Sequence, residues 1–379
     1  MIYRLLNIIH TMKLALKFGI AYGLAELIHQ LWSIRRYNHF NNLRISYGET
    51  KDDIRVMARS LLAKNPTLFE RARLYAHTSH VRDEDDFCAS IATRPEQTPA
   101  NKLQVGCAKL YWRFTPLGFD VLMKIARQVG NIYVRHWLGF KRAWHKTDDG
   151  YYSVWSHVVN NTKPLLFFPG VGLGAIPYAK VAKSFGRTVH IIEVPNIGYA
   201  TPLSDSQATP QNLHSVVSKH VDDGCDIFAH SLGSIHAAMY MNEIHTIPTQ
   251  KYKAIICDGC VNPFDIFTSH IYPFVGLGDL SIVRKKPKSW VEFMAFVYFC
   301  VYNIEVQSFT KRYHTFYNGT LWRDYQNATI QYVYSRHDIL YDTEFIAENT
   351  DCTFLQKGGH GSSVFSKARN LRFPATLPC

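Results

Sequence analysis

Short apolar runs recur along the second half of the chain, separated by stretches with helical spacing. A short continuous apolar run predicts a strand that is buried on both faces, as in a parallel sheet. The segments between the runs are long enough for crossover helices, so we expect βαβ units. Thr209 and Pro210 predict the start of one such helix. The predicted strands are 151–155, 165–168, 189–192, 227–228, 254–256, 330–334 and 353–355.

The N-terminal part of the chain has a different pattern. Residues 14–34 are mostly apolar and suffice for a helix that reaches across a bilayer. Charged residues interrupt this segment, and Arg35 and Arg36 follow it at once, as is typical of a membrane interface. We predict that residues 1–36 form a membrane-associated helix. The alternative is a helix that packs against the body of the protein.

Three further segments complete the predicted organisation. Residues 37–147 contain helix-capping patterns, such as Thr67 with Glu70, and are expected to be helical. Residues 148–379 are expected to form the sheet domain. Within that domain, residues 262–325 are rich in aromatic side chains and break the rhythm of strands and helices. We expect this insertion to be a lid over an apolar pocket.

The net charge of the chain limits the classes of partner that it is expected to bind. The 379 residues include 42 Lys and Arg against 30 Asp and Glu, a formal net charge of +12. A basic surface attracts anionic membranes, nucleic acids and acidic ligands. The chain has no nucleic-acid-binding motif and no dense basic tract with interleaved aromatics, so we expect no nucleic-acid partner. We expect a membrane-associated protein, with a cytoplasmic location as the alternative.

One pentapeptide carries the candidate chemistry. Residues 229–233 read Ala-His-Ser-Leu-Gly and directly follow the predicted strand 227–228. A serine with small residues two positions before and after it, between a strand and a helix, is the form of a nucleophile elbow. The sharp turn strains the serine backbone and exposes its hydroxyl, and only small residues fit around it. We predict that Ser231 is a catalytic nucleophile.

Two later residues complete a triad with Ser231. Asp338 and His360 each follow a predicted strand, the histidine within a glycine-rich segment. The carboxyl ends of parallel strands share one edge of a sheet, so we expect the three side chains to meet there. The order Ser, Asp, His is the order that the elbow topology requires. Asp258, at the end of an earlier strand, is the alternative acid.

Acyl transfer also needs backbone donors for the oxyanion. One is expected from Leu232, where the dipole of the following helix favours negative charge. The other is expected from the glycine-rich loop after strand 165–168, with Val171 as the donor and Gly172 as the alternative. The glycines of this loop lack the spacing of a dinucleotide-binding loop, so we expect no nucleotide.

We expect neither a cofactor nor a metal. Cys257 and Cys260 form an isolated C-x-x-C pair beside a buried strand, without the second pair of a zinc site. His77 and His80 invite a metal-binding interpretation, and His80 with Asp85 matches an acyltransferase pattern. Both features lie next to a charge run that is typical of a solvated loop.

On the residues above, segment 151–365 resembles the α/β-hydrolase family, whose members carry the oxyanion loop, the elbow, the acid and the histidine in this order. The resemblance implies a mostly parallel sheet flanked by helices, with a lid after the sixth strand. The chain departs from the family at Pro169, where histidine is usual, and at Ala229 and Ser234, where glycine is common. None of these departures removes a catalytic group.

Together these features predict a serine hydrolase that cleaves a carboxylic ester of a lipid or another apolar acyl group through an acyl-enzyme intermediate. Ser231 is expected to attack the carbonyl, His360 to take its proton and Asp338 to orient the imidazole. The alternatives are an acyltransferase on the same fold and an interaction protein without catalysis.

Overall fold

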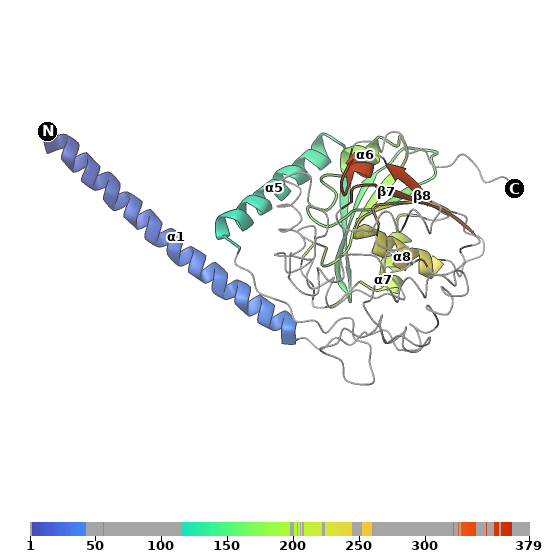
Figure 1. The fold of residues 1–379 in the computed structure, drawn as a ribbon, viewed down its shortest axis with the longest axis horizontal. Coiled ribbons are helices and arrows are strands. Elements are labelled where there is room, and N and C mark those ends of the chain that lie inside the picture. Colours follow the sequence, from blue (N-terminus) through green and yellow to red (C-terminus); the bar gives the residue numbers. More distant parts are fainter. Residues whose placement is uncertain are drawn as a thin grey trace.

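The structure is a computed structural model (Figure 1). It describes residues 2–42, 56, 115–197, 201–202, 204, 206, 208–221, 224–244, 252–259, 321, 325, 327–338, 346, 352–355 and 358–365. The strands are β1 (Lys141–Thr147), β2 (Gly150–His157), β3 (Leu165–Phe168), β4 (Val189–Glu193), β5 (Asp226–His230), β6 (Tyr252–Cys257), β7 (Ala328–Ser335) and β8 (Cys352–Leu355). The helices are α1 (Ile2–Asn42), α5 (Leu117–His136), α6 (Ala179–Lys183), α7 (Pro210–Val217), α8 (Gly233–Ile244) and α15 (Ser362–Phe365).

The strands form one sheet in the order β1-β2-β4-β3-β5-β6-β7-β8. Strands β3 to β8 are parallel to one another, whereas β2 is antiparallel to both of its neighbours, β1 and β4. Helices separate most of the parallel strands along the chain, as in βαβ units. This mostly parallel sheet with flanking helices is the α/β-hydrolase fold, so the predicted fold class is confirmed.

Both faces of the sheet are buried, which explains the continuous apolar runs. Leu166 and Phe168 of β3 point into a core that α7 and α8 cover. Leu165 and Phe167 point the opposite way, into a second core to which α5, α6 and α15 contribute. Burying one such side chain stabilises the fold by about 2 kcal/mol. Strand β3 accordingly has a buried apolar side chain at every one of its positions.

The predicted strands are present as β2 to β8, with ends that differ by a few residues from the apolar runs. The predicted helix start at Thr209 is also confirmed, because the Thr209 hydroxyl accepts a hydrogen bond from the Asn212 amide at the first turn of α7. Pro210 occupies the first helical position, where a missing N–H costs nothing.

The sheet begins earlier than predicted. Strand β1 lies at Lys141–Thr147, inside the segment 37–147 that we expected to be helical, so the predicted boundary at 148 is corrected. This edge strand pairs only with β2, and its side chains are exposed or half-buried, so its sequence has no apolar run. The predictions for His77, His80, Asp85 and Cys260, and nearly all of the predicted lid, lie outside the described residues.

Helix α1 is longer than the predicted segment and extends away from the body of the sheet domain (Figure 1). Its Glu26 carboxylate accepts a hydrogen bond from the Leu117 amide at 2.9 Å, at the start of α5. The Gln30 side-chain amide donates to the Thr115 carbonyl at 2.9 Å. A carboxylate is favourable at a helix N-terminus, so these contacts fix α5 to α1. Among the helices described, none has the length and apolarity that crossing a membrane requires.

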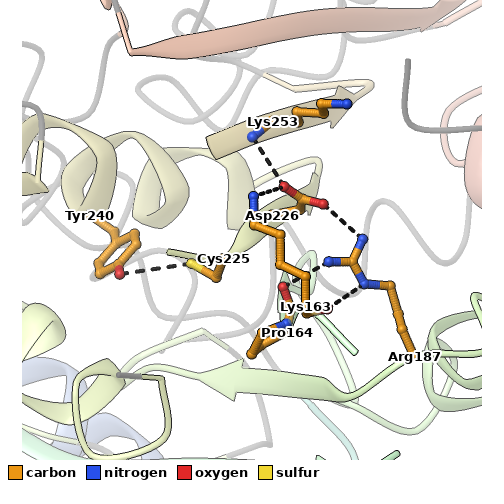
Figure 2. Close-up of polar contacts among 7 residues, drawn as sticks. All are labelled: Lys163, Pro164, Arg187, Cys225, Asp226, Tyr240 and Lys253. Atoms are coloured by element: carbon orange, nitrogen blue, oxygen red, sulfur yellow. Dashed lines mark hydrogen bonds and ion pairs between the residues drawn. The ribbon is translucent and has the colours of Figure 1, made fainter. Parts of the chain in front are cut away.

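A charged cluster ties together the amino-terminal ends of the central strands (Figure 2). Asp226, the first residue of β5, accepts hydrogen bonds from Lys163 Nζ and from an Arg187 guanidinium nitrogen, each at 2.8 Å. The same guanidinium donates to the carbonyls of Lys163 and Pro164, just before β3. Burial raises the pKa of the Asp226 carboxyl, but the hydrogen bonds and charges of the two basic residues outweigh it and lower that pKa.

Replacing Asp226 with asparagine should lower the free energy of unfolding at pH 7 by about 2 kcal/mol, between the values for exposed and buried ion pairs. Because the folded-state pKa of the wild-type carboxyl is lowered, its contribution is complete above the unfolded-state pKa and is lost as the pH falls through the folded-state pKa. Urea unfolding between pH 3 and pH 7 checks both points. A wild-type midpoint for Asp226→Asn at neutral pH would contradict the prediction.

Candidate active site

Ser231 lies directly after β5, in the turn that leads into α8. Its φ is 51°, in the left-handed region that residues with a side chain rarely adopt. The Ser231 amide donates to the Cys257 carbonyl at 3.0 Å, and the Ser234 amide donates to the Ser231 carbonyl at 2.9 Å. These bonds hold the turn on both sides. The strained serine backbone of a nucleophile elbow is therefore present.

Gly233, two residues after this serine, begins α8 against the end of β3. A Cβ atom at this position would lie 2.3 Å from the Pro169 carbonyl oxygen and 2.4 Å from the Phe168 carbonyl oxygen. Both atoms belong to the backbone of a buried strand end, which cannot move aside as a side chain can. The geometry explains why this position of the pentapeptide is glycine.

Replacing Gly233 with alanine should destabilise the fold by more than about 3 kcal/mol, at the upper end of overpacking effects, because backbone has to shift at the centre of the sheet. Gly23→Ala in α1 is the matched control, since a Cβ there meets nothing within 4 Å. Alanine is the better helix former, so the control should be neutral or slightly stabilising. Thermal unfolding of both variants checks the prediction, and equal melting temperatures would refute it.

The structure brings the three predicted catalytic side chains together. Ser231 Oγ lies 2.7 Å from His360 Nε2. Nδ1 of the same imidazole lies 2.7 Å from a carboxylate oxygen of Asp338. Because a carboxylate only accepts, Nδ1 carries the proton in the neutral ring and Nε2 accepts from the serine hydroxyl. Asp338 is fully buried, and the histidine side chain is 18% exposed.

Asp258, the alternative acid, contacts other groups. It follows β6, and one of its carboxylate oxygens accepts a hydrogen bond from the Ser335 amide at 2.6 Å. The other oxygen accepts from the Ser335 hydroxyl at 3.2 Å and from the Gly361 amide at 2.9 Å. Asp338, the first of the two predicted acids, accepts the hydrogen bond from Nδ1 of the candidate histidine.

A chain of hydrogen bonds connects the glycine-rich loop to the elbow. The Gly170 amide donates to the Tyr178 hydroxyl at 3.1 Å, and this hydroxyl lies 2.9 Å from His230 Nδ1. A Cβ at Gly170 would lie 2.7 Å from the tyrosine oxygen and 3.1 Å from Ser231 Cβ. The loop backbone therefore packs directly on the nucleophile. Since the Gly170 amide is engaged, Val171 and Gly172 remain the candidate donors of this loop.

The surroundings of His230 and Tyr178 favour the neutral form of both side chains. Burial lowers the pKa of His230 well below its usual range, and the neighbouring His360 adds to the effect. Burial also raises the pKa of the Tyr178 hydroxyl. His230 is therefore neutral and accepts from the tyrosine. The two imidazole centroids are 5.3 Å apart, so a second charge here would oppose protonation of His360.

The far end of the glycine-rich loop is held by β4. The Ala175 amide donates to the Glu193 carboxylate at 2.8 Å, and Arg142 pairs with the same carboxylate at 2.9 Å. Gly172 and Gly174 have φ values of 128° and 64°, which only glycine adopts readily. With its two ends fixed, the loop presents its backbone beside Ser231. Pro169, where the family has histidine, does not prevent this arrangement.

The two carboxylates and the imidazole lie close together. One carboxylate oxygen each from Asp258 and Asp338 and a ring nitrogen of His360 lie within 4.8 Å of one another. Protein groups donate hydrogen bonds to both carboxylates. The three side chains are therefore part of a hydrogen-bond network around the imidazole.

Tyr178 and its partner His230 were not singled out as functional in the sequence. Tyr178 lies in the segment before α6, 52 positions from its partner His230, so no local pattern joins them. A signal did exist, because a histidine on a buried strand needs a polar partner. The identity of that partner depends on the loop conformation and could not be predicted.

No family model and no curated protein matches the chain. Among solved structures, it is similar to a membrane phospholipase A described as a bacterial virulence factor, with 13% identity, a TM-score of 0.46, and coverage of 67% of this chain and 95% of that one. It is similar to naproxen esterase from Bacillus subtilis, with 14% identity, a TM-score of 0.44, and coverage of 65% and 94%. It is also similar to a carboxylesterase from the same organism, with 9% identity, a TM-score of 0.42, and coverage of 65% and 94%.

Proposed function

We propose that the protein is a serine hydrolase that cleaves carboxylic esters of apolar acyl groups through an acyl-enzyme intermediate. The observation that carries the proposal is the hydrogen-bonded series from Ser231 through His360 to Asp338, with the serine in a strained turn. A buried serine has no structural need for this combination of a left-handed backbone and an imidazole acceptor.

The proposed reaction follows from the roles of these groups. His360 Nε2 takes the proton as the hydroxyl oxygen of Ser231 attacks the ester carbonyl, and the imidazolium then protonates the leaving alcohol. Asp338 keeps the proton on Nδ1 and stabilises the imidazolium. The amides of Leu232 and of Val171 or Gly172 receive the oxyanion. Water, activated by His360, then releases the acyl group.

An apolar acyl group suits the surroundings of the elbow. A small pocket is lined by residues of the elbow, the glycine-rich loop and β4. Its lining is mainly apolar and includes Phe168, Ile192, Val194 and Ile197. We propose that the acyl side of the ester lies against these apolar side chains, since apolar walls with a few oriented polar groups are the usual surroundings of such a ligand.

A fluorophosphonate probe tests the proposed function directly. The purified full chain should become labelled, with the modified peptide carrying the label on Ser231, and should hydrolyse p-nitrophenyl esters with a preference for longer acyl chains. A preparation that is folded by circular dichroism, yet neither labelled nor active on any ester, would refute the proposal. Adding an alcohol acceptor and measuring the ratio of transferred to hydrolysed acyl group distinguishes an acyltransferase.

We also propose that the enzyme works at a membrane surface. Many large apolar side chains of α1 and α5 are exposed, and such a surface is costly in water. Arg36 lies over the Trp32 ring at 4.4 Å, a basic and aromatic pairing suited to the headgroup region. The exposed side chains include Leu16, Phe18, Ile20, Leu24, Leu27, Ile28 and Leu31 of α1, and Leu122, Ile125, Val129 and Ile132 of α5.

Sedimentation with anionic lipid vesicles tests the membrane proposal. The wild-type chain should sediment with the vesicles, and the double variant Phe18→Glu with Leu24→Glu should remain mostly in the supernatant. Lys180→Glu, at an exposed position of α6, changes the net charge by the same amount and should still sediment. Equal binding by all three proteins would exclude α1 as the attachment site.

A further inference from the structure

Asp258 is the one buried carboxylate beside the candidate triad, among the described residues, that the proposed reaction leaves without a role. It is fully buried and has a φ of 45°, again in the left-handed region. A charged side chain is costly to bury, so it persists only where other interactions require it.

Asp258 contacts residues next to Asp338 and next to His360. Its carboxylate binds the amide and the hydroxyl of Ser335, the last residue of β7. The Ser335 carbonyl in turn accepts from the Asp338 amide at 3.0 Å. The other contact is with the amide of Gly361, directly after His360. One carboxylate therefore holds the loop with the acid and the loop with the histidine.

The charge of Asp258 also acts on the imidazole. In the described part of the chain, the titratable groups around His360 are Asp338 after β7, Asp258 after β6 and the neutral His230 at the end of β5. An oxygen of the Asp258 carboxylate lies within 4.8 Å of a ring nitrogen of this histidine. A negative charge at this distance stabilises an imidazolium.

We infer that Asp258 is a positioning residue for the proposed hydrolysis: it fixes the loops of Asp338 and His360 relative to each other, and its charge favours the protonated form of His360. The inference rests on the proposed function and deepens it. A displacement of about 1 Å between catalytic groups is enough to slow a reaction by about 100-fold. The carboxylate prevents such a displacement from two sides.

Kinetics of Asp258→Asn on a p-nitrophenyl ester test the inference. We expect kcat to fall by about 10- to 100-fold with KM nearly unchanged. We also expect the acid limb of the kcat/KM profile to move to lower pH by about one unit, because the imidazolium loses a favourable charge. A merely structural carboxylate would lower stability without moving this limb. An unchanged kcat and an unchanged acid limb would overturn the inference.

Two further variants keep the test decisive. Ser335→Ala removes one contact with Asp258 but no charge, so it should lower kcat by several-fold and leave the acid limb in place. Ser335→Ala also tests the inference if Asp258→Asn does not fold. A wild-type kcat in Ser335→Ala would then contradict the positioning role of Asp258. Asp226→Asn removes a carboxylate at the amino-terminal ends of the strands, far from the site. It should lower the stability of the fold without changing kcat or the acid limb. If the wild-type chain is neither labelled nor active, the proposed function fails rather than this inference.

Discussion

Replacing Ser231 with alanine should lower kcat for ester hydrolysis by at least about 10⁴-fold and abolish fluorophosphonate labelling. The hydroxyl is the only group at the elbow that can form the acyl bond to the substrate, and His360 has no other proton to take for this step. The rate that remains would reflect the oxyanion donors and substrate binding alone.

The same substitution should leave the fold intact. Alanine has the same left-handed strain as serine, and the change removes only one hydroxyl group from the turn. Circular dichroism and the melting temperature should therefore match the wild type. Ser184→Ala, at an exposed serine at the end of α6, is the control and should keep full activity. Residual activity of more than about 1% in Ser231→Ala would mean that another group is the nucleophile.

The second large effect concerns the acid. Asp338→Asn should lower kcat by about 10³- to 10⁴-fold with KM nearly unchanged. An asparagine oxygen still accepts from Nδ1, but the neutral amide does not stabilise the imidazolium, and its NH₂ group favours the wrong tautomer. The acid limb of the kcat/KM profile should also move to lower pH, because the imidazolium loses a favourable charge.

Asp120→Asn on α5 is the matched control for this substitution. Asp120 pairs with Lys124 on the same helix and belongs to no part of the site, so its replacement should not change kcat. A loss of less than about tenfold in Asp338→Asn would show that the second nearby carboxylate can take over as the acid. That result would restore Asp258 as the alternative that the sequence left open.

The central strands could be predicted because burial on both faces imposes a continuous apolar run. Strand β1 could not, since an edge strand with one partner and exposed side chains needs no such run. A boundary prediction from apolar runs therefore starts the sheet at its first buried strand. The omission of β1 from the prediction did not alter the predicted triad, whose members lie at the carboxyl ends of β5, β7 and β8.

The candidate triad could be predicted because each member follows a strand in a fixed order. The choice between Asp338 and Asp258 could not be settled from spacing, because both follow strands that end at the same edge of the sheet. Which carboxylate meets the imidazole depends on how far each loop extends past its strand. Tyr178 was missed for a related reason, since its contact with His230 is made by loop geometry.

The strained residues have a consequence for attempts to make this protein more robust. Four non-glycine residues in the described part of the chain have positive φ: three are asparagine or aspartate, the types that tolerate this conformation, and the fourth is Ser231. The backbone of Ser231 costs roughly 1–2 kcal/mol of folding free energy. Selection of random variants for heat resistance alone should therefore find relief at this position and, in doing so, discard the proposed nucleophile. Laboratory evolution of this chain needs a screen for turnover at every round.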